Sequence, residues 1–146
     1  MERSIDRPLQ LVLVRHAESV RNEVKKDASF FADETARNKV RGIADEEVPL
    51  TETGKAQARI TGHVLKQSFG TFDYVYHSGY KRTIETVDEL LKSYTDAEKA
   101  RMHVRMSSFI RERDSGYAYD MTEEEATKQF PWMAEYWKTF GGFFAV

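Results

Sequence analysis

The chain has 146 residues, of which 32% are charged, and its formal net charge at pH 7 is −2. These values describe one soluble domain without the basic surface that attracts nucleic acid. The absence of cysteine excludes a disulfide framework, a thiolate zinc site and a cysteine nucleophile. The first ten residues lack the apolar core of a signal peptide, and no apolar run reaches membrane-spanning length, so we expect a cytoplasmic protein without membrane contact.

The first predicted element is a strand at Leu11 to Val14, an apolar run that leads directly into Arg15 and His16. Because the run has no polar alternation, it predicts a strand buried on both faces of a parallel sheet. Ligands of open α/β sheets bind at the carboxyl ends of the strands, where Arg15 and His16 would lie. Taken alone, the pair is better explained as a strand end that meets solvent.

Residues 23–48 form a long, charged segment that is broken by Gly42 and contains one bulky apolar pair, Phe30 and Phe31. This composition predicts a loop with one helical turn. Loops of this length are usually functional or disordered. The role of the segment stays open at the level of the sequence.

A helix is predicted next, with Thr51 as its N-cap and Gly70 just past its end. Ala58, Val64 and Leu65 are expected on its inward face. We interpret this helix as scaffold.

A second parallel strand is predicted at residues 72–76, which are mostly aromatic or β-branched. It leads into a helix with Arg82 in its first turn, facing the strand ends. An arginine at a helix start is usually solvated. A cation there is nevertheless mildly unfavourable against the helix dipole, which hints at a bound anion.

The third predicted strand covers residues 102–110, and Glu112 follows its end. A carboxylate flanked by two arginines is most often part of a surface charge cluster. Glu112 is a candidate site residue because it too follows a strand. The histidines at other positions are interpreted as packing residues: His63, His77 and His103.

From Tyr119 the chain becomes acidic and then aromatic. Thr122 followed by Glu125 is a capping box that opens a helix. The aromatic residues that follow, over residues 130–140, are explained either by a stripe packed into the core or by a lid over the site. Between Asp114 and Val146 the only basic residues are Lys128 and Lys138.

Three motifs resemble the histidine phosphatase superfamily, the phosphoglycerate-mutase-like proteins. They are Arg-His-Ala-Glu-Ser-x-x-Asn at residues 15–22, Leu-Thr-x-x-Gly-x-x-Gln-Ala at 50–58 and Ser-x-x-x-Arg-Thr at 78–83, and they stand in the family's order. Ala17 replaces the usual glycine. The resemblance implies a three-layer α/β/α sandwich with a mainly parallel sheet, and it makes part of residues 23–48 an insertion.

The same resemblance implies a single domain over residues 1–146 that is truncated at its C-terminus. The family has a second active-site histidine on a later strand, and no histidine follows His103 in this sequence. We therefore expect a chain that lacks the C-terminal strands of the fold.

The resemblance also assigns roles to individual residues. His16 would be the nucleophile that forms a phosphohistidine, and Glu112 would protonate the leaving oxygen. Arg15, Asn22 and Arg82 would bind the phosphate. Two arginine forks balance its nearly two negative charges, so no metal and no cofactor is expected. The same two cations would keep His16 neutral.

The predicted function is hydrolysis of a small-molecule phosphomonoester through a phosphohistidine on His16, with the substrate and the oligomeric state left open. The scarcity of basic residues after Asp114, and Ser115 where mutases have tyrosine, favour a phosphatase over a phosphoglycerate-mutase-type phosphotransferase. A third reading, an inactive phosphate-binding fragment, follows from the absent second histidine. No nucleic-acid partner is expected.

Overall fold

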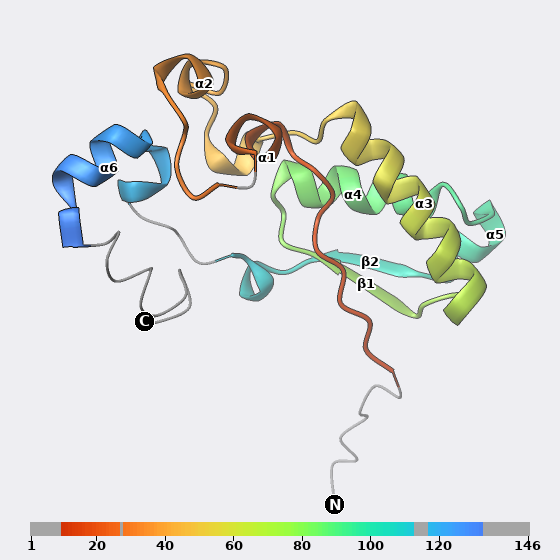
Figure 1. Cartoon of the computed structure of the whole chain (residues 1–146). Helices are drawn as coiled ribbons and strands as arrows, with labels where there is room; N and C mark the ends of the chain where they lie inside the picture. Colours follow the sequence, from red (N-terminus) through yellow and green to blue (C-terminus); the bar gives the residue numbers. More distant parts are fainter. Residues whose placement is uncertain (1–9, 27, 113–116, 133–146) are drawn as a thin grey trace, which may run out of the picture.

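The computed structural model describes residues 10–26, 28–112 and 117–132 (Figure 1). The helices in chain order are α1 (Val20–Lys25), α2 (Glu34–Asn38), α3 (Glu52–Phe69), α4 (Lys81–Leu91), α5 (Asp96–Lys99) and α6 (Glu123–Gln129). Short 3₁₀ turns are η1 (Asp45–Glu47), η2 (Ser108–Ile110) and η3 (Tyr117–Asp120). The strands are β1 (Tyr74–His77) and β2 (His103–Met106). In the described part of the chain, none of the helices combines the length and apolar character needed to cross a membrane.

The two strands pair in parallel, with Tyr74 opposite His103 and His77 opposite Met106. This confirms the predicted α/β class with a parallel sheet, and both strands lie within or next to the predicted ranges. The third predicted strand was expected to run to residue 110 but ends at Met106. The Ser107 amide still donates to the His77 carbonyl at 2.9 Å. Because β1 ends there, the chain finds no further partner on β1 and turns into η2.

The strand predicted at Leu11 to Val14 is wrong as a description of this structure. These residues run as an irregular trace (Figure 1), and the side chains of Leu11 and Leu13 are 74% and 85% exposed. A strand needs a neighbour to receive its backbone hydrogen bonds. Within the described residues β1 pairs only with β2, and neither strand pairs with this segment.

Helices α3 and α4 pack against each other, and glycine makes their close approach possible. The Thr51 hydroxyl accepts from the Gly54 amide at 2.9 Å, as predicted for an N-cap, and Gly70 ends α3. A Cβ on Gly62 would lie 2.3 Å from the Leu90 carbonyl oxygen of α4. The buried stripe of α3 is Gly54, Ala58 and Gly62, at a spacing of four residues.

This stripe corrects the predicted inward face of α3. Ala58 is buried as expected, Leu65 is half-buried, and Val64 is 51% exposed. Gly62 faces α4, where the two backbones approach too closely for a branched aliphatic side chain, and Gly54 lies against the backbone of Glu18.

The segment 23–48, predicted as a loop with one helical turn, contains α2, η1 and the second half of α1. It also contributes three fully buried side chains, those of Phe31, Val40 and Val48. The prediction failed because isolated apolar residues in a charged stretch show no periodicity. Phe31 in addition contacts residues far along the chain.

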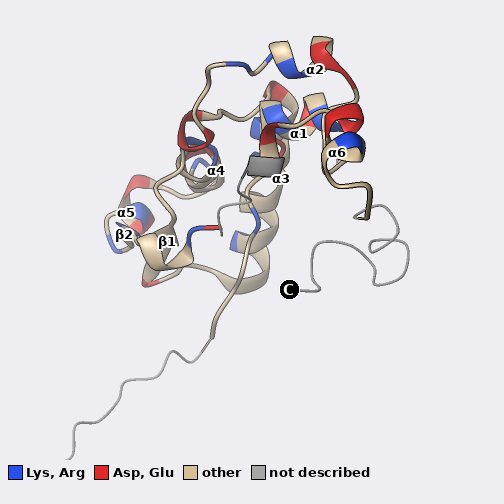
Figure 2. Cartoon of the chain, turned by 90° about the vertical axis from the view of Figure 1, so that its left-hand side faces the viewer, with Lys and Arg blue, Asp and Glu red and all other residues tan. Residues whose placement is uncertain are grey.

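One such contact joins Phe31 to the start of α6. The Phe31 amide donates to the Met121 carbonyl at 3.1 Å, and the Glu123 amide donates to the Phe31 carbonyl at 2.8 Å. Charged residues of both signs gather where α2 faces α6 (Figure 2), and Arg37 donates to Glu125 there at 2.6 Å. Figure 1 shows α1, α2 and α6 together on one side of the molecule and α3, α4 and the sheet on the other.

The capping box at Thr122 is confirmed, since its hydroxyl accepts from the Glu125 amide and the Glu125 carboxylate accepts from the Thr122 amide. Of the aromatic residues that follow, Phe130 is half-buried and Trp132 is 62% exposed. The rest of that stripe lies outside the described residues.

Candidate active site

His16 lies in the irregular stretch between the exposed apolar run and α1. Its Nδ1 donates to the Ala17 carbonyl at 2.8 Å, which leaves Nε2 of a neutral ring with a free electron pair. Burial lowers the pKa of His16, and the positive charges of Arg82 and Arg15 lower it further, whereas the Ala17 carbonyl and Glu112 act in the opposite direction. The net effect favours the neutral, nucleophilic imidazole.

Thr86 of α4 connects this helix to the backbone next to His16. The Thr86 hydroxyl accepts from the Ala17 amide at 3.2 Å and donates to the Arg82 carbonyl at 2.6 Å. A cavity of about 220 Å³ lies beside it, between residues 14–17 and the two helices α3 and α4.

Arg82 stands in the first turn of α4, as predicted, but its side chain is buried and only 5% exposed. Nη1 donates to the Asp45 carbonyl at 2.7 Å and to Asp45 Oδ1 at 3.1 Å, and Nη2 donates to Asp45 Oδ2 at 3.2 Å. On its other side, Nη2 lies 3.7 Å from Glu112 Oε2. The guanidinium is thus surrounded by two carboxylates.

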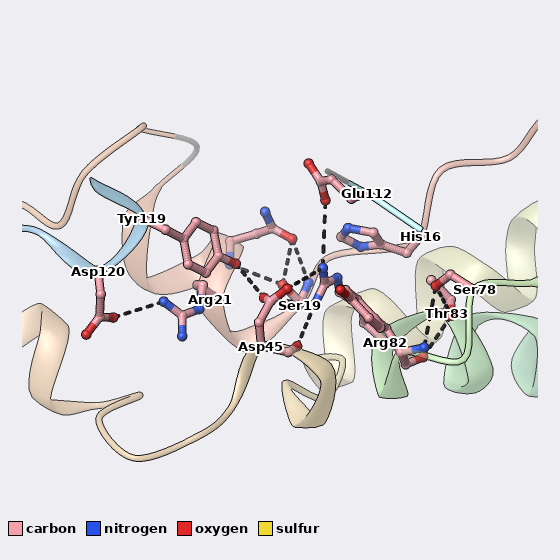
Figure 3. A network of polar contacts seen from close by, with 12 residues as sticks. His16, Ser19, Arg21, Asp45, Ser78, Arg82, Thr83, Glu112, Tyr119 and Asp120 are labelled. Atoms are coloured by element: carbon pink, nitrogen blue, oxygen red, sulfur yellow. Dashed lines mark hydrogen bonds and ion pairs between the residues drawn. The ribbon is translucent and has the colours of Figure 1, made fainter. Parts of the chain in front are cut away.

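Glu112 follows η2, and its side chain is 69% exposed. Its carboxylate points toward the Arg82 guanidinium, with the His16 ring alongside (Figure 3). Three of the predicted site residues, far apart in the sequence, therefore meet at one place.

Asn22 lies on α1, and part of its side chain is already engaged. Its Oδ1 accepts from the Ser19 amide at 3.1 Å and from the Ser19 hydroxyl at 2.7 Å in a capping box. Within the described residues its side-chain amide nitrogen makes no hydrogen bond, and this donor is the one that remains for a ligand. Arg15 is exposed, and its contribution within the described residues is the positive charge that it adds near His16.

Asp45 and Tyr119 are site residues that the sequence did not predict. The Tyr119 hydroxyl donates to Asp45 Oδ1 at 2.7 Å. Burial alone would raise the pKa of Asp45, but the hydrogen bonds from Tyr119 and Arg82 and the charges of Arg82 and Arg21 outweigh burial and hold the pKa below its usual range. Asp45 is therefore an anion. Nothing in the sequence separates it from the adjacent Glu46 and Glu47.

Two buried cations of α1 lie close to the ring of Tyr119. The Arg21 guanidinium lies 4.4 Å and the Lys25 ammonium 4.5 Å from the centre of its ring. Lys25 also donates to the Tyr119 carbonyl at 2.7 Å. Burial, followed by the hydrogen bond to Asp45, raises the pKa of Tyr119, so its hydroxyl stays protonated.

The remaining histidines lie away from this group. His77 accepts from the Gly79 amide at 3.2 Å, the His103 ring lies 5.2 Å from that of Tyr74, and His63 is exposed on α3. Across residues 10–26, 28–112 and 117–132, no cluster of three or more His, Asp or Glu side chains is placed to hold a metal ion.

Comparison with known proteins places these motifs in a family. The sequence model of the histidine phosphatase superfamily (branch 1) matches residues 11–143 of this chain. The phosphoglycerate mutase-like protein AT74H of Arabidopsis thaliana is 33% identical over 119 residues, which cover 75% of this chain and 37% of that protein. A 2,3-bisphosphoglycerate-dependent phosphoglycerate mutase of Blochmanniella pennsylvanica (strain BPEN) is 30% identical over 121 residues, which cover 83% of this chain and 44% of the relative. The chain thus spans less than half the length of either relative.

Proposed function

The chain belongs to the histidine phosphatase superfamily, and on this premise we propose that it hydrolyses phosphomonoesters through a phosphohistidine formed on His16. The observation that carries the proposal is the meeting of His16, Arg82 and Glu112 at one place. A neutral imidazole beside a guanidinium and a carboxyl group matches the needs of in-line phosphoryl transfer, which depends mainly on positioning and charge.

In the first step, the phosphate dianion binds to Arg15 and Arg82, with the amide nitrogen of Asn22 donating to a phosphoryl oxygen. Nε2 of His16 attacks phosphorus while the bond from phosphorus to the ester oxygen breaks. Glu112, protonated at this stage, gives its proton to the leaving oxygen. The products are an alcohol and the phosphohistidine.

In the second step, the Glu112 carboxylate takes a proton from water while the water oxygen attacks phosphorus. The bond between phosphorus and Nε2 breaks, and this returns the electron pair to His16. Inorganic phosphate leaves, and Glu112 is again protonated for the next cycle.

A second candidate, phosphoryl transfer of mutase type, is favoured by the name of the Blochmanniella pennsylvanica relative. Transfer between two phosphorylated molecules needs cations for a second anionic group. Lys128, one of the two lysines after Asp114, is paired with Glu124 at 2.6 Å. The scarcity of basic residues after Asp114 supports transfer to water over transfer to a phosphorylated acceptor.

The test is hydrolysis of an aryl phosphate in the presence of a chelator, with wild type, His16→Ala and the matched control His63→Ala. We expect turnover in wild type and in the exposed-histidine control, and no turnover in His16→Ala. Mass spectrometry of acid-free samples should detect one added phosphoryl group on His16 of the wild type.

Equal turnover in His16→Ala would refute His16 as the nucleophile. A wild-type protein without turnover that still binds orthophosphate would refute hydrolysis and leave phosphate binding alone. Phosphoryl transfer from the phosphohistidine to an added phosphoglycerate, faster than to water, would favour the mutase-type reaction.

A further inference from the structure

We propose that Asp45 is a positioning residue that holds the Arg82 guanidinium in the orientation needed to bind phosphate, and that Tyr119 holds Asp45 in turn. This inference rests on the proposed function, since it assumes that Arg82 binds the phosphate. It adds to the site a residue of η1 and one of η3.

The bonds of Arg82 are divided between two sides of its planar fork. Among the described residues, Nη1 has two acceptors, and both belong to Asp45. Nη2 has one bond to Asp45 and on the other side faces Glu112 at 3.7 Å. Because the guanidinium is rigid and flat, fixing the Nη1 side fixes the direction of the side that faces Glu112 and His16.

The backbone of Asp45 takes part in this arrangement. Its carbonyl oxygen accepts the shortest of the three bonds, 2.7 Å from Nη1. A rotation of the Asp45 side chain would leave that bond in place. The backbone of Asp45 is therefore part of the wall of the site, and a change of its side chain tests the two bonds of the carboxylate alone.

Asp45 is held in place by residues of η3 and α1. The Tyr119 hydroxyl donates to Asp45 Oδ1, and the Tyr119 ring makes cation–π contacts with Arg21 and Lys25. Arg21 is nearly fully buried, with a side chain that is 8% exposed, and it pairs with Asp120, the neighbour of Tyr119. The segment around Tyr119 thus reaches Arg82 through one hydrogen bond to Asp45.

Two explanations of the Asp45 carboxylate predict opposite results for its removal. If Asp45 competes with phosphate, Asp45→Asn frees the fork, removes a negative charge and tightens binding. If Asp45 positions Arg82, the same change weakens binding even though it removes a repulsive charge. The matched control is Glu46→Gln, which removes the same charge from the exposed next residue of η1.

The experiment measures two properties of wild type, Asp45→Asn, Tyr119→Phe and Glu46→Gln. The first is the Nε–Hε NMR resonance of Arg82, assigned by its loss in Arg82→Lys. The second is the dissociation constant of orthophosphate from a titration. In the wild type we expect a resonance distinct from those of exposed arginines, and it should shift when phosphate binds.

Asp45→Asn should move the Arg82 resonance toward that of exposed arginines and weaken phosphate binding about tenfold, the size expected for loss of a hydrogen bond to a charged group. Tyr119→Phe should do the same to a smaller extent, and Glu46→Gln should leave the resonance in place. An unmoved resonance in Asp45→Asn would overturn the inference, as would tighter phosphate binding by that variant.

The two readouts separate this inference from the proposed function. A wild type whose resonances do not respond to phosphate would contradict the proposed function. The Arg82 resonance in Asp45→Asn would still show whether Asp45 orients the guanidinium.

Discussion

The pair of helices α3 and α4 and the group formed by α1, α2 and α6 are stabilised by different means. In the helix pair, small residues bring two backbones together, and a methyl group on Gly62 would have no room beside Leu90. In the three-helix group, short helices are joined by the buried Phe31 ring and by two buried cations that stack on aromatic rings. The candidate site lies where the two regions meet: Arg82 comes from α4, Asp45 from η1, which follows α2, and Tyr119 from η3, which precedes α6.

The difference between the regions teaches where each one is vulnerable. The helices of the pair are longer, with 18 residues in α3 and 11 in α4, and a steric change at their contact is the change that should disturb them most. The three-helix group has helices of five to seven residues, which are too short to be stable alone. Its stability must come from a few long-range contacts.

The largest expected effect is the loss of Phe31 from the three-helix group. Its side chain is fully buried, and Phe31→Ala should lower the free energy of unfolding by about 4 kcal/mol. The control is Phe109→Ala, because Phe109 is 99% exposed and its removal should change stability little. Urea unfolding of both variants measures the difference. Similar losses in the two variants would show that Phe31 does not hold the group together.

A second expected effect is a dependence of the free energy of unfolding on pH, because the three-helix group contains the buried amine of Lys25. Burial, followed by the charge of Arg21, lowers the pKa of Lys25 to about 8 from the ordinary 10.5. Between these two values the unfolded chain binds more protons than the folded protein, so the Lys25 contribution makes stability rise with pH. The full window is worth on the order of 3 kcal/mol.

The measurement is the free energy of unfolding from pH 7 to pH 10.5 for wild type, Lys25→Met and the control Lys26→Met. The rise with pH should be smaller in Lys25→Met than in the other two proteins, because Lys25 is buried and Lys26 is exposed. Parallel curves for all three would mean that Lys25 is solvated in the folded protein.

The smallest of the expected effects is in the helix pair, at Gly62. In an exposed helix interior, Gly→Ala stabilises by about 1 kcal/mol. At Gly62 the added methyl group meets the backbone of Leu90, so Gly62→Ala should instead destabilise by about 2 kcal/mol. Thermal unfolding alongside Ser68→Ala, an exposed change on the same helix, decides the sign. A stabilised Gly62→Ala would show that the two helices are less closely packed.

The elements that the sequence predicted well are those with local signals. Thr51, Gly70 and Thr122 mark helix ends through contacts a few residues away, and the aromatic content of residues 72–76 indicates a strand without knowledge of its partner. Leu11 to Val14 carries an equally strong strand signal. It fails because a strand also requires a neighbour, and pairing is a property of the whole sheet.

The candidate site shows the same limit. His16, Arg82 and Glu112 were expected from family motifs, and the structure brings them together. Asp45 lies 37 residues from Arg82 and Tyr119 lies 74 residues from Asp45, so no local pattern connects them. The contacts of Asp45 with Tyr119, and of Tyr119 with Arg21 and Lys25, form only when the chain folds.

The Thr86 hydroxyl has a consequence for the motions of the site. It accepts from the backbone just after His16 and donates to the backbone of Arg82. One side chain of α4 therefore links the backbone next to His16 to the backbone of Arg82, and we expect an opening of α4 to affect both. The Ala17 amide belongs to no helix or strand, but it donates to Thr86 of α4. Its exchange with deuterium should therefore follow the opening of α4. The exchange rate of this one amide would report how long His16 and Arg82 keep their relative positions.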